Sequence, residues 1–148
     1  MSKLLERLSD PARSGVYRAR HDADIADAVR GSPLALTRIN LGKGSKAGSR
    51  AEILAAFAEA FEFPDWFGRN WDALEDCLGD LSWRKADGHV LLIADFDRVA
   101  RDELGVLREV LAASAEFWAG RGRPFFAVFV DPHRALTLPD LYKEKPVR

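Results

Sequence analysis

Two aspartates near the middle of the chain, Asp72 and Asp76, are of the right type and spacing to do chemistry. They stand four positions apart, so a helix carries both on one face. Asp80 continues the same line if that helix extends past Gly79. Such a pair can bind a divalent cation, work as an acid and a base, or meet cations on a partner protein. A solvated helix face is the alternative without chemistry.

The residues around this pair favour a protein partner. A hard-cation site needs several convergent oxygen ligands, which a single helix rarely supplies. No histidine or lysine lies near in sequence to complete an acid–base pair, and His21, His89 and His133 show no metal-ligand spacing. The single cysteine, Cys77, excludes an internal disulfide and a cysteine-rich zinc site, and we expect it to be a buried structural thiol. We therefore predict no catalytic residue, metal or cofactor.

Charge and aromatic residues single out the same stretch. The chain has 22 Lys and Arg and 23 Asp and Glu, but residues 51–97 hold 3 of the basic and 11 of the acidic residues. A net charge of −1 argues against a nucleic-acid binder, whereas a local acidic excess attracts a basic protein. Large aromatic residues beside carboxylates are typical of protein interfaces, and we expect about half of those flanking the aspartates on the surface. These are Trp66, Phe67, Trp71 and Trp83.

Hydrophobic periodicity and turn signals predict the elements that position these residues. Strands are expected at 15–19, 34–41, 89–94 and 124–130, and helices around 4–8 and over 22–30, 53–61, 71–78 and 104–118. Asn70 is the expected N-cap of the helix 71–78, and Gly79 its expected end. Strands that alternate with helices predict an α/β fold with a mostly parallel sheet.

The apolar segments of the chain are short. The longest runs fall far below the roughly 20 residues that a membrane span needs. Charged residues interrupt the N-terminal segment, which lacks the apolar core of a signal peptide. We therefore expect a soluble, cytoplasmic protein.

The segment from Phe63 to Leu78 reads FPDWFGRNWDALEDCL. It resembles the signature of the barstar family, bacterial intracellular inhibitors of secreted guanyl-specific ribonucleases such as barnase. A looser likeness covers residues 33–130 in the same order of elements. It implies a three-stranded parallel sheet packed against helices, to which the N-terminal strand is added. One domain, 1–148, would then comprise this core, a strand–helix extension at 1–32 and an irregular tail at 131–148.

The resemblance also implies a mode of action. The family plugs the ribonuclease active site with the signature helix and the loop before it, whose carboxylates take the place of RNA phosphate. Carried over by position, Asp76 is the central acidic anchor, Asp72 the second carboxylate and Trp66 the aromatic at the mouth of the enzyme. Further contacts are implied for Phe67, Gly68, Asn70 and Trp71 in the loop and helix start, for Trp83 after a two-residue insertion, and for Glu116 on the last helix.

Two departures from the family pattern bear on the partner. Glu75 stands where the best-known member has a tryptophan, and Trp66 replaces a smaller aromatic. We expect a non-catalytic inhibitor that binds a basic guanyl-specific ribonuclease one to one, with no direct binding of nucleic acid, membrane or small-molecule substrate. Two alternatives stay open: an interaction or immunity module of the same fold for another basic toxin or nucleic-acid-binding protein, and an enzyme that uses Asp72 and Asp76 with a metal.

Overall fold

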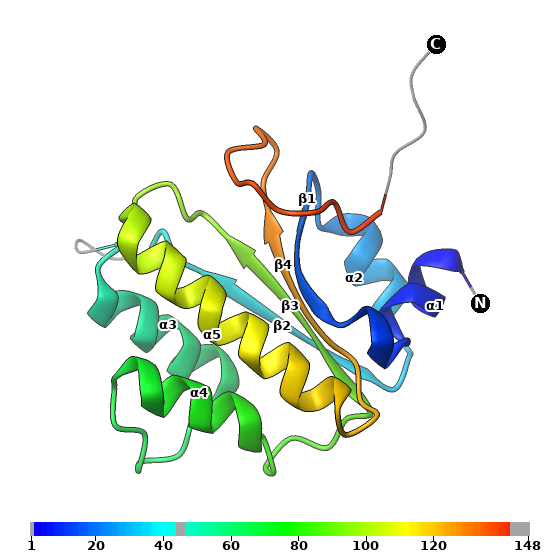
Figure 1. Ribbon diagram of the computed structural model, residues 1–148, viewed down its shortest axis with the longest axis horizontal. Helices are drawn as coiled ribbons and strands as arrows, with labels where there is room; N and C mark the ends of the chain where they lie inside the picture. The colour runs from blue at the N-terminus through cyan, green and yellow to red at the C-terminus, as the bar shows by residue number, and fades with distance from the viewer. Residues whose placement is uncertain (1, 44–46, 143–148) are drawn as a thin grey trace.

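The computed structural model describes residues 2–43 and 47–142 (Figure 1). Within these residues the chain forms one sheet of four strands, β1 (Gly15–Ala19), β2 (Leu34–Asn40), β3 (Gly88–Ala94) and β4 (Phe125–Val130). The strands lie in the order β1-β4-β3-β2, and every neighbouring pair is parallel. The predicted α/β fold, with an N-terminal strand added to a parallel sheet, is confirmed.

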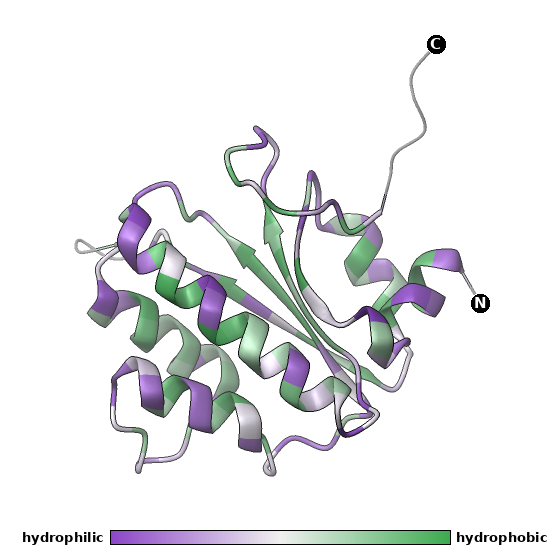
Figure 2. Cartoon of the chain, in the orientation of Figure 1, coloured by the Kyte–Doolittle hydropathy of each residue, from purple (hydrophilic) through white to green (hydrophobic). Residues whose placement is uncertain are grey.

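Helices cover both faces of this sheet. On one face lie α3 (Arg50–Phe61), α4 (Trp71–Asp80) and α5 (Arg101–Ala119), and on the other lie α1 (Lys3–Leu8) and α2 (Ala23–Val29). Successive residues of a strand point to opposite faces. Accordingly, Leu91 and Ile93 of β3 pack in the core beneath α3, α4 and α5. Val90 and Leu92 pack in a second core, on the opposite face beneath α1 and α2. Figure 2 shows the result: central strands β3 and β4 that are apolar along most of their length, beneath helices with mixed surfaces.

The N-terminal extension completes the sheet and its second face. β1 pairs with β4, from Gly15 opposite Phe126 to Ala19 opposite Val130, and therefore lies at the opposite edge from β2. Leu8 of α1 and Ile25 and Val29 of α2 pack in the second core. A short 3-10 helix, Pro11–Arg13, connects α1 to β1. Residues 2–32 are thus integrated into the fold.

One prediction about α4 is wrong. Gly79 does not end the helix, which continues to Asp80 and ends where Leu81 adopts a left-handed backbone conformation with φ 47°. That conformation is unfavourable for leucine, but its side chain is 2% exposed and packs in the core beneath α4. The burial of Leu81 therefore decides the end of the helix, and Asp80 becomes part of α4.

The segment after β4 has no helix or strand among its described residues, which end at Tyr142. It is nevertheless attached to β1: Arg18 donates to a carboxylate oxygen of Asp140 at 2.9 Å and to the carbonyl of Leu136 at 2.7 Å. Residues 143–148 of the predicted tail lie outside the described residues. Throughout the described ranges, every helix is too short or too polar to cross a membrane.

Candidate protein-binding surface

The buried side of α4 fixes the orientation of the helix. Leu74, Cys77 and Leu78 are fully buried. Trp118 of α5 donates its indole N–H to the carbonyl oxygen of Leu78 at 2.8 Å, which pairs one of the carbonyls that the last turn of a helix leaves unsatisfied. The packing and this bond join α4 to α5 and hold the opposite side of α4 toward solvent.

Asn70 begins α4, as predicted. Its side-chain oxygen accepts a hydrogen bond from the backbone N–H of Ala73 at 2.7 Å, and its amide group donates to the carbonyl of Gly68 at 3.4 Å. Arg69, between Gly68 and Asn70, has a left-handed φ of 54°. The Asn70 side chain thus ties the loop before α4 to the first turn of the helix.

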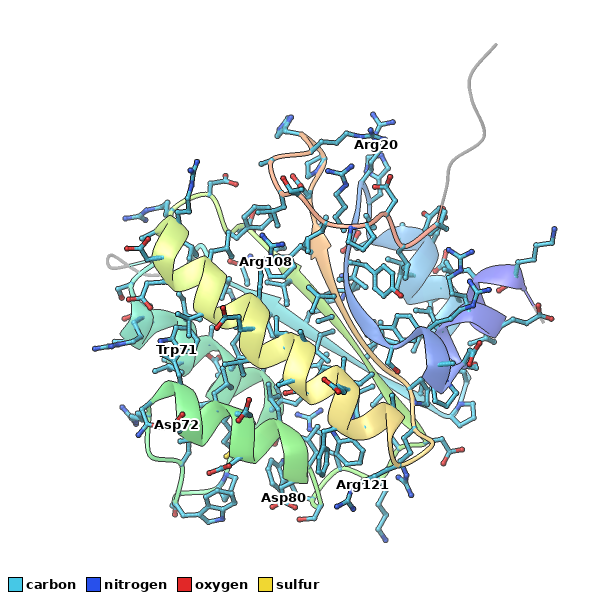
Figure 3. The ribbon with its side chains drawn as sticks, in the orientation of Figure 1. Arg20, Trp71, Asp72, Asp80, Arg108 and Arg121 are labelled. Atoms are coloured by element: carbon cyan, nitrogen blue, oxygen red, sulfur yellow. The ribbon has the colours of Figure 1, made fainter. Side chains whose placement is uncertain are left out.

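The outer side of α4 carries exposed carboxylates. Asp72, Asp76 and Asp80 follow one another along the helix with Glu75 beside them, and we call these four residues the acidic row. Figure 3 shows Asp72 and Asp80 at the two ends of α4. Among the described residues, no cation forms an ion pair with any member of the row. Neighbouring like charges repel, so a cationic partner relieves this repulsion.

Cys77 lies on the inner side of the same helix. The thiol is free and fully buried, and burial raises its pKa to about 11, with the carboxylates of Asp76 and Asp80 contributing further. A thiol in such surroundings is a poor nucleophile. The prediction of a buried structural thiol is confirmed.

An aromatic cluster shapes the loop between α3 and α4. The ring of Phe63 lies 4.9 Å from that of Phe67 and 6.1 Å from that of Trp83, centroid to centroid. Trp83 also donates its indole N–H to the carbonyl oxygen of Phe61 at 2.8 Å. These contacts anchor the loop on the core, so Phe67 and Trp83 have a structural role as well as any role at a surface.

Trp66 lies outside this cluster. Its side chain is 58% exposed, whereas Phe67, Trp71 and Trp83 are partly buried against the core. The expectation that about half of these aromatics lie on the surface is therefore too high, because Trp66 is the one of the four that is exposed. An open hollow of about 400 Å³ separates Trp66 from the end of α4. It is lined by Glu62, Pro64, Trp66, Asp80, Ser82, Trp83 and Arg84.

The hollow combines aromatic rings with the carboxylates of Glu62 and Asp80. Cations bind over aromatic faces and beside carboxylates. Arg84 on its wall already pairs with Glu62 at 3.4 Å, so Asp80 and the aromatic rings are what the hollow offers to a lysine or arginine side chain of a partner. Of the acidic row, Asp80 lines the hollow, together with Trp66 and Trp83.

Helix α5 carries two neighbouring exposed residues in its last turn. Glu116, a predicted contact, is exposed. Phe117, which sequence reasoning missed, is 40% exposed, and a Cβ on Gly79 would lie 3.8 Å from its ring. The ring thus covers the bare backbone of α4 one turn after Asp76. Phe117 lies outside the buried periodicity of α5, and an aromatic at such a position is the signal that identifies it.

Metal binding finds no support in the arrangement. Among the residues that the structure describes, no group of three or more His, Cys, Asp or Glu side chains is placed to hold a metal ion. The side chains of the acidic row point outward along one helix. Their arrangement is suited to charge complementarity with another protein.

Comparison with known protein families gives one match. The model of the Barstar family, described as barstar (barnase inhibitor), matches residues 39–130. A comparison with curated proteins returned no match. The matched range runs from the end of β2 to the end of β4 and includes α4 and the loop before it. Because the match covers well over half of the chain, the protein belongs to the barstar (barnase inhibitor) family.

Proposed function

We propose that this protein is a non-catalytic inhibitor of a basic, guanyl-specific ribonuclease, and that α4 and the loop before it plug the active site of the enzyme. The acidic row carries this proposal. Its carboxylates are exposed and have no ion-pair partner among the described residues, on a helix whose other side is buried. Family membership supplies the class of partner.

Electrostatics explains how such a helix inhibits. A ribonuclease binds a polyanion, so its cleft is basic. Asp76 and Asp72 offer two negative charges at a fixed spacing, where RNA would offer phosphates. Because packing already holds α4, little conformational entropy is lost on binding. The interaction is expected to be fast and salt-sensitive, as for other charge-complementary pairs.

The remaining predicted contacts receive roles from their positions. Trp66 is proposed as the exposed aromatic anchor, and Glu75 adds a charge beside Asp76. Glu116 is proposed as a peripheral acidic contact from α5. Residues that shape or border the same surface complete the set: Phe67, Gly68, Asn70 and Trp71 in the loop and helix start, and Trp83 on the wall of the hollow.

Inhibition of RNA cleavage tests the proposal. Several guanyl-specific ribonucleases, barnase included, are titrated with the wild type and with Asp76→Ala. Stoichiometric inhibition is expected from the wild type, with affinity reduced about 30-fold or more in the variant. That factor corresponds to about 2 kcal/mol, the lower end of the general cost of unpairing a buried charge, a range for which the barnase–barstar pair is itself the standard example.

Glu6→Ala is the matched control, because Glu6 is an exposed carboxylate of α1 on the other face of the sheet. It is expected to inhibit like the wild type. Equal inhibition by Asp76→Ala and the wild type would contradict the assigned anchor. A folded protein that inhibits none of the enzymes would contradict the proposed target.

A module for another basic partner is the second candidate. The observation that favours it is Glu75, exposed beside Asp76 where the best-known member of the family has a tryptophan. Such a change replaces apolar contact by charge and alters partner choice. Wild type and Asp76→Ala would be used as bait in extract of the source cells. Recovery of ribonucleases alone would count against this candidate, and recovery of a different basic protein by the wild type only would favour it.

A further inference from the structure

A groove with the opposite charge lies beyond the end of α4. It is open, has a volume of about 980 Å³, and lies between the α4–β3 loop, the start of β3 and the α5–β4 loop. We call it the basic groove and define it by Arg84, Lys85, His89, Arg121 and Arg123. Figure 3 shows Arg121 beyond the C-terminal end of α5. We propose that the basic groove binds a phosphate group.

The guanidinium groups around the groove are held in place. Arg84 donates through Nε to the carbonyl of Phe61 at 3.3 Å, and through Nη2 to that of Ala60 at 2.7 Å and to a carboxylate oxygen of Glu62 at 3.4 Å. Its Nη1 has no partner among the described residues. Arg123 donates through Nη1 to the carbonyl of Ala86 at 2.9 Å and keeps its other donors. Such groups lose little entropy when they bind an anion.

The other two cations lie nearer to solvent. The guanidinium carbon of Arg121 sits 4.4 Å from the centre of the Phe117 ring, which orients the group without using its hydrogen-bond donors. Lys85 is exposed and forms no ion pair within the described residues. Two carboxylates, Asp80 and Asp87, also line the groove, and Glu62 outside it pairs with Arg84. The four cations of the groove outnumber these three anions.

His89 provides a second, independent observation. Its side chain is 3% exposed and lines the groove, yet its Nδ1 is buried with no hydrogen-bond partner among the described residues. Buried polar atoms are nearly always paired, so an unpaired nitrogen in a residue of the groove wall is unusual. The pKa of His89 is lowered to about 4, first by burial and then by Arg84 and Arg123. The positive charge of the groove therefore reaches this imidazole.

Phosphate is the anion that fits these donors best. Guanidinium groups match its oxygens through paired N–H donors. Cations are stabilised near the C-terminal ends of helices, which explains why some of these residues lie beyond α4 and α5. It does not explain the buried, unpaired nitrogen of His89. The groove and the acidic row share Asp80 but present opposite charges. The proposal therefore does not depend on the proposed inhibition of a ribonuclease.

Binding of pyrophosphate to the full chain is the first test. Isothermal titration at fixed ionic strength is expected to show saturable binding, weakened at least about tenfold in the double variant Lys85→Gln/Arg121→Gln. The control Lys3→Gln/Arg30→Gln removes two exposed cations from the α1 and α2 side and is expected to bind like the wild type. No saturable binding, or equal weakening in both double variants, would overturn the proposal.

The His89 imidazole gives a readout that does not depend on substitution. Its NMR titration is followed in sodium sulfate and in sodium chloride of equal ionic strength, because sulfate stays doubly charged from pH 3 to 7. Sulfate is expected to raise the pKa of His89 by at least half a pH unit above the chloride value, since a bound anion offsets Arg84 and Arg123. Identical pKa values in the two salts would show that only screening acts and would refute the site.

Two further probes distinguish the source of the phosphate. Competition of hexauridylate with pyrophosphate for the groove would support the proposal with an RNA phosphate as ligand. Binding of pyrophosphate without such competition would support it with a small phosphorylated compound. Binding of hexaglutamate in the absence of pyrophosphate binding would overturn it, because the groove would then prefer an acidic peptide.

Discussion

Trp83 donates its indole N–H to the carbonyl oxygen of Phe61, with 2.8 Å between the nitrogen and the oxygen. Phe61 is the last residue of α3, and Glu62 after it adopts a left-handed conformation with φ 55°. The bond therefore pairs a carbonyl that the end of the helix leaves free, and it is shorter than the 3.3 Å bond that Arg84 Nε donates to the same oxygen. A residue that the family resemblance presents as a partner contact thus also stabilises the end of α3.

Trp83→Phe is expected to lower the free energy of unfolding by about 1 kcal/mol, because it keeps an aromatic ring and removes the hydrogen bond. Urea unfolding of the variant measures this. Trp66→Phe serves as the control and is expected to change stability by less than about 0.5 kcal/mol, since Trp66 is exposed. Equal stability of both variants would contradict the structural role of Trp83.

Asn70→Ala is expected to destabilise the protein by about 1 kcal/mol, the usual cost of losing a helix N-cap. The variant removes the oxygen that accepts from the N–H of Ala73. Asn70→Asp keeps such an oxygen and is expected to remain near the stability of the wild type. Thermal unfolding of the three proteins checks this, and an alanine variant as stable as the aspartate variant would show that the cap contributes nothing.

Gly79→Ala is expected to stabilise the protein by about 0.5 kcal/mol, because glycine with helical backbone, here in the last turn of α4, costs more conformational entropy than alanine. The added Cβ would lie 3.8 Å from the Phe117 ring, an ordinary contact. Gly88→Ala is the contrasting variant: its Cβ would come within 2.5 Å of the Cγ of Pro124 and 2.8 Å of its carbonyl oxygen, and loss of stability is expected. Denaturant midpoints measure both, and a Gly79 variant less stable than the wild type would refute the expected gain.

His89 is expected to make stability depend on pH. Its pKa is about 4 in the folded protein and near 6.5 when exposed, so between these values the unfolded chain binds a proton that the folded chain does not. The contribution of His89 to the free energy of unfolding is largest above pH 6.5 and falls by up to about 3 kcal/mol as the pH drops to 4.

Urea unfolding between pH 7.5 and 4.5 measures this loss. His133→Asn is the control, because His133 is exposed, and its pH profile is expected to match that of the wild type. Direct NMR titration of the folded protein separates His89 from the carboxylates that titrate in the same range. A His89 pKa near 6.5 in the folded protein would contradict the expectation.

The local features of the candidate surface could be read from the sequence. Asn70 as a helix cap, Asp72 and Asp76 on one face, and Cys77 on the inner side follow from residue types and helical spacing within one short segment. The four strands follow in the same way, because a short apolar run between turn residues is typical of a buried strand. Each of these inferences depends on interactions within a few residues, where spacing determines direction.

Contacts between distant segments decided the rest. β1 lies beside β4 because of packing across more than a hundred residues, and α4 ends at Leu81 because the core buries that side chain. The bond from Trp83 to Phe61 and the cover of Gly79 by Phe117 likewise join residues far apart in sequence. Spacing along the chain determines which side of an element a residue lies on, but only the packing of elements against one another determines what that side meets.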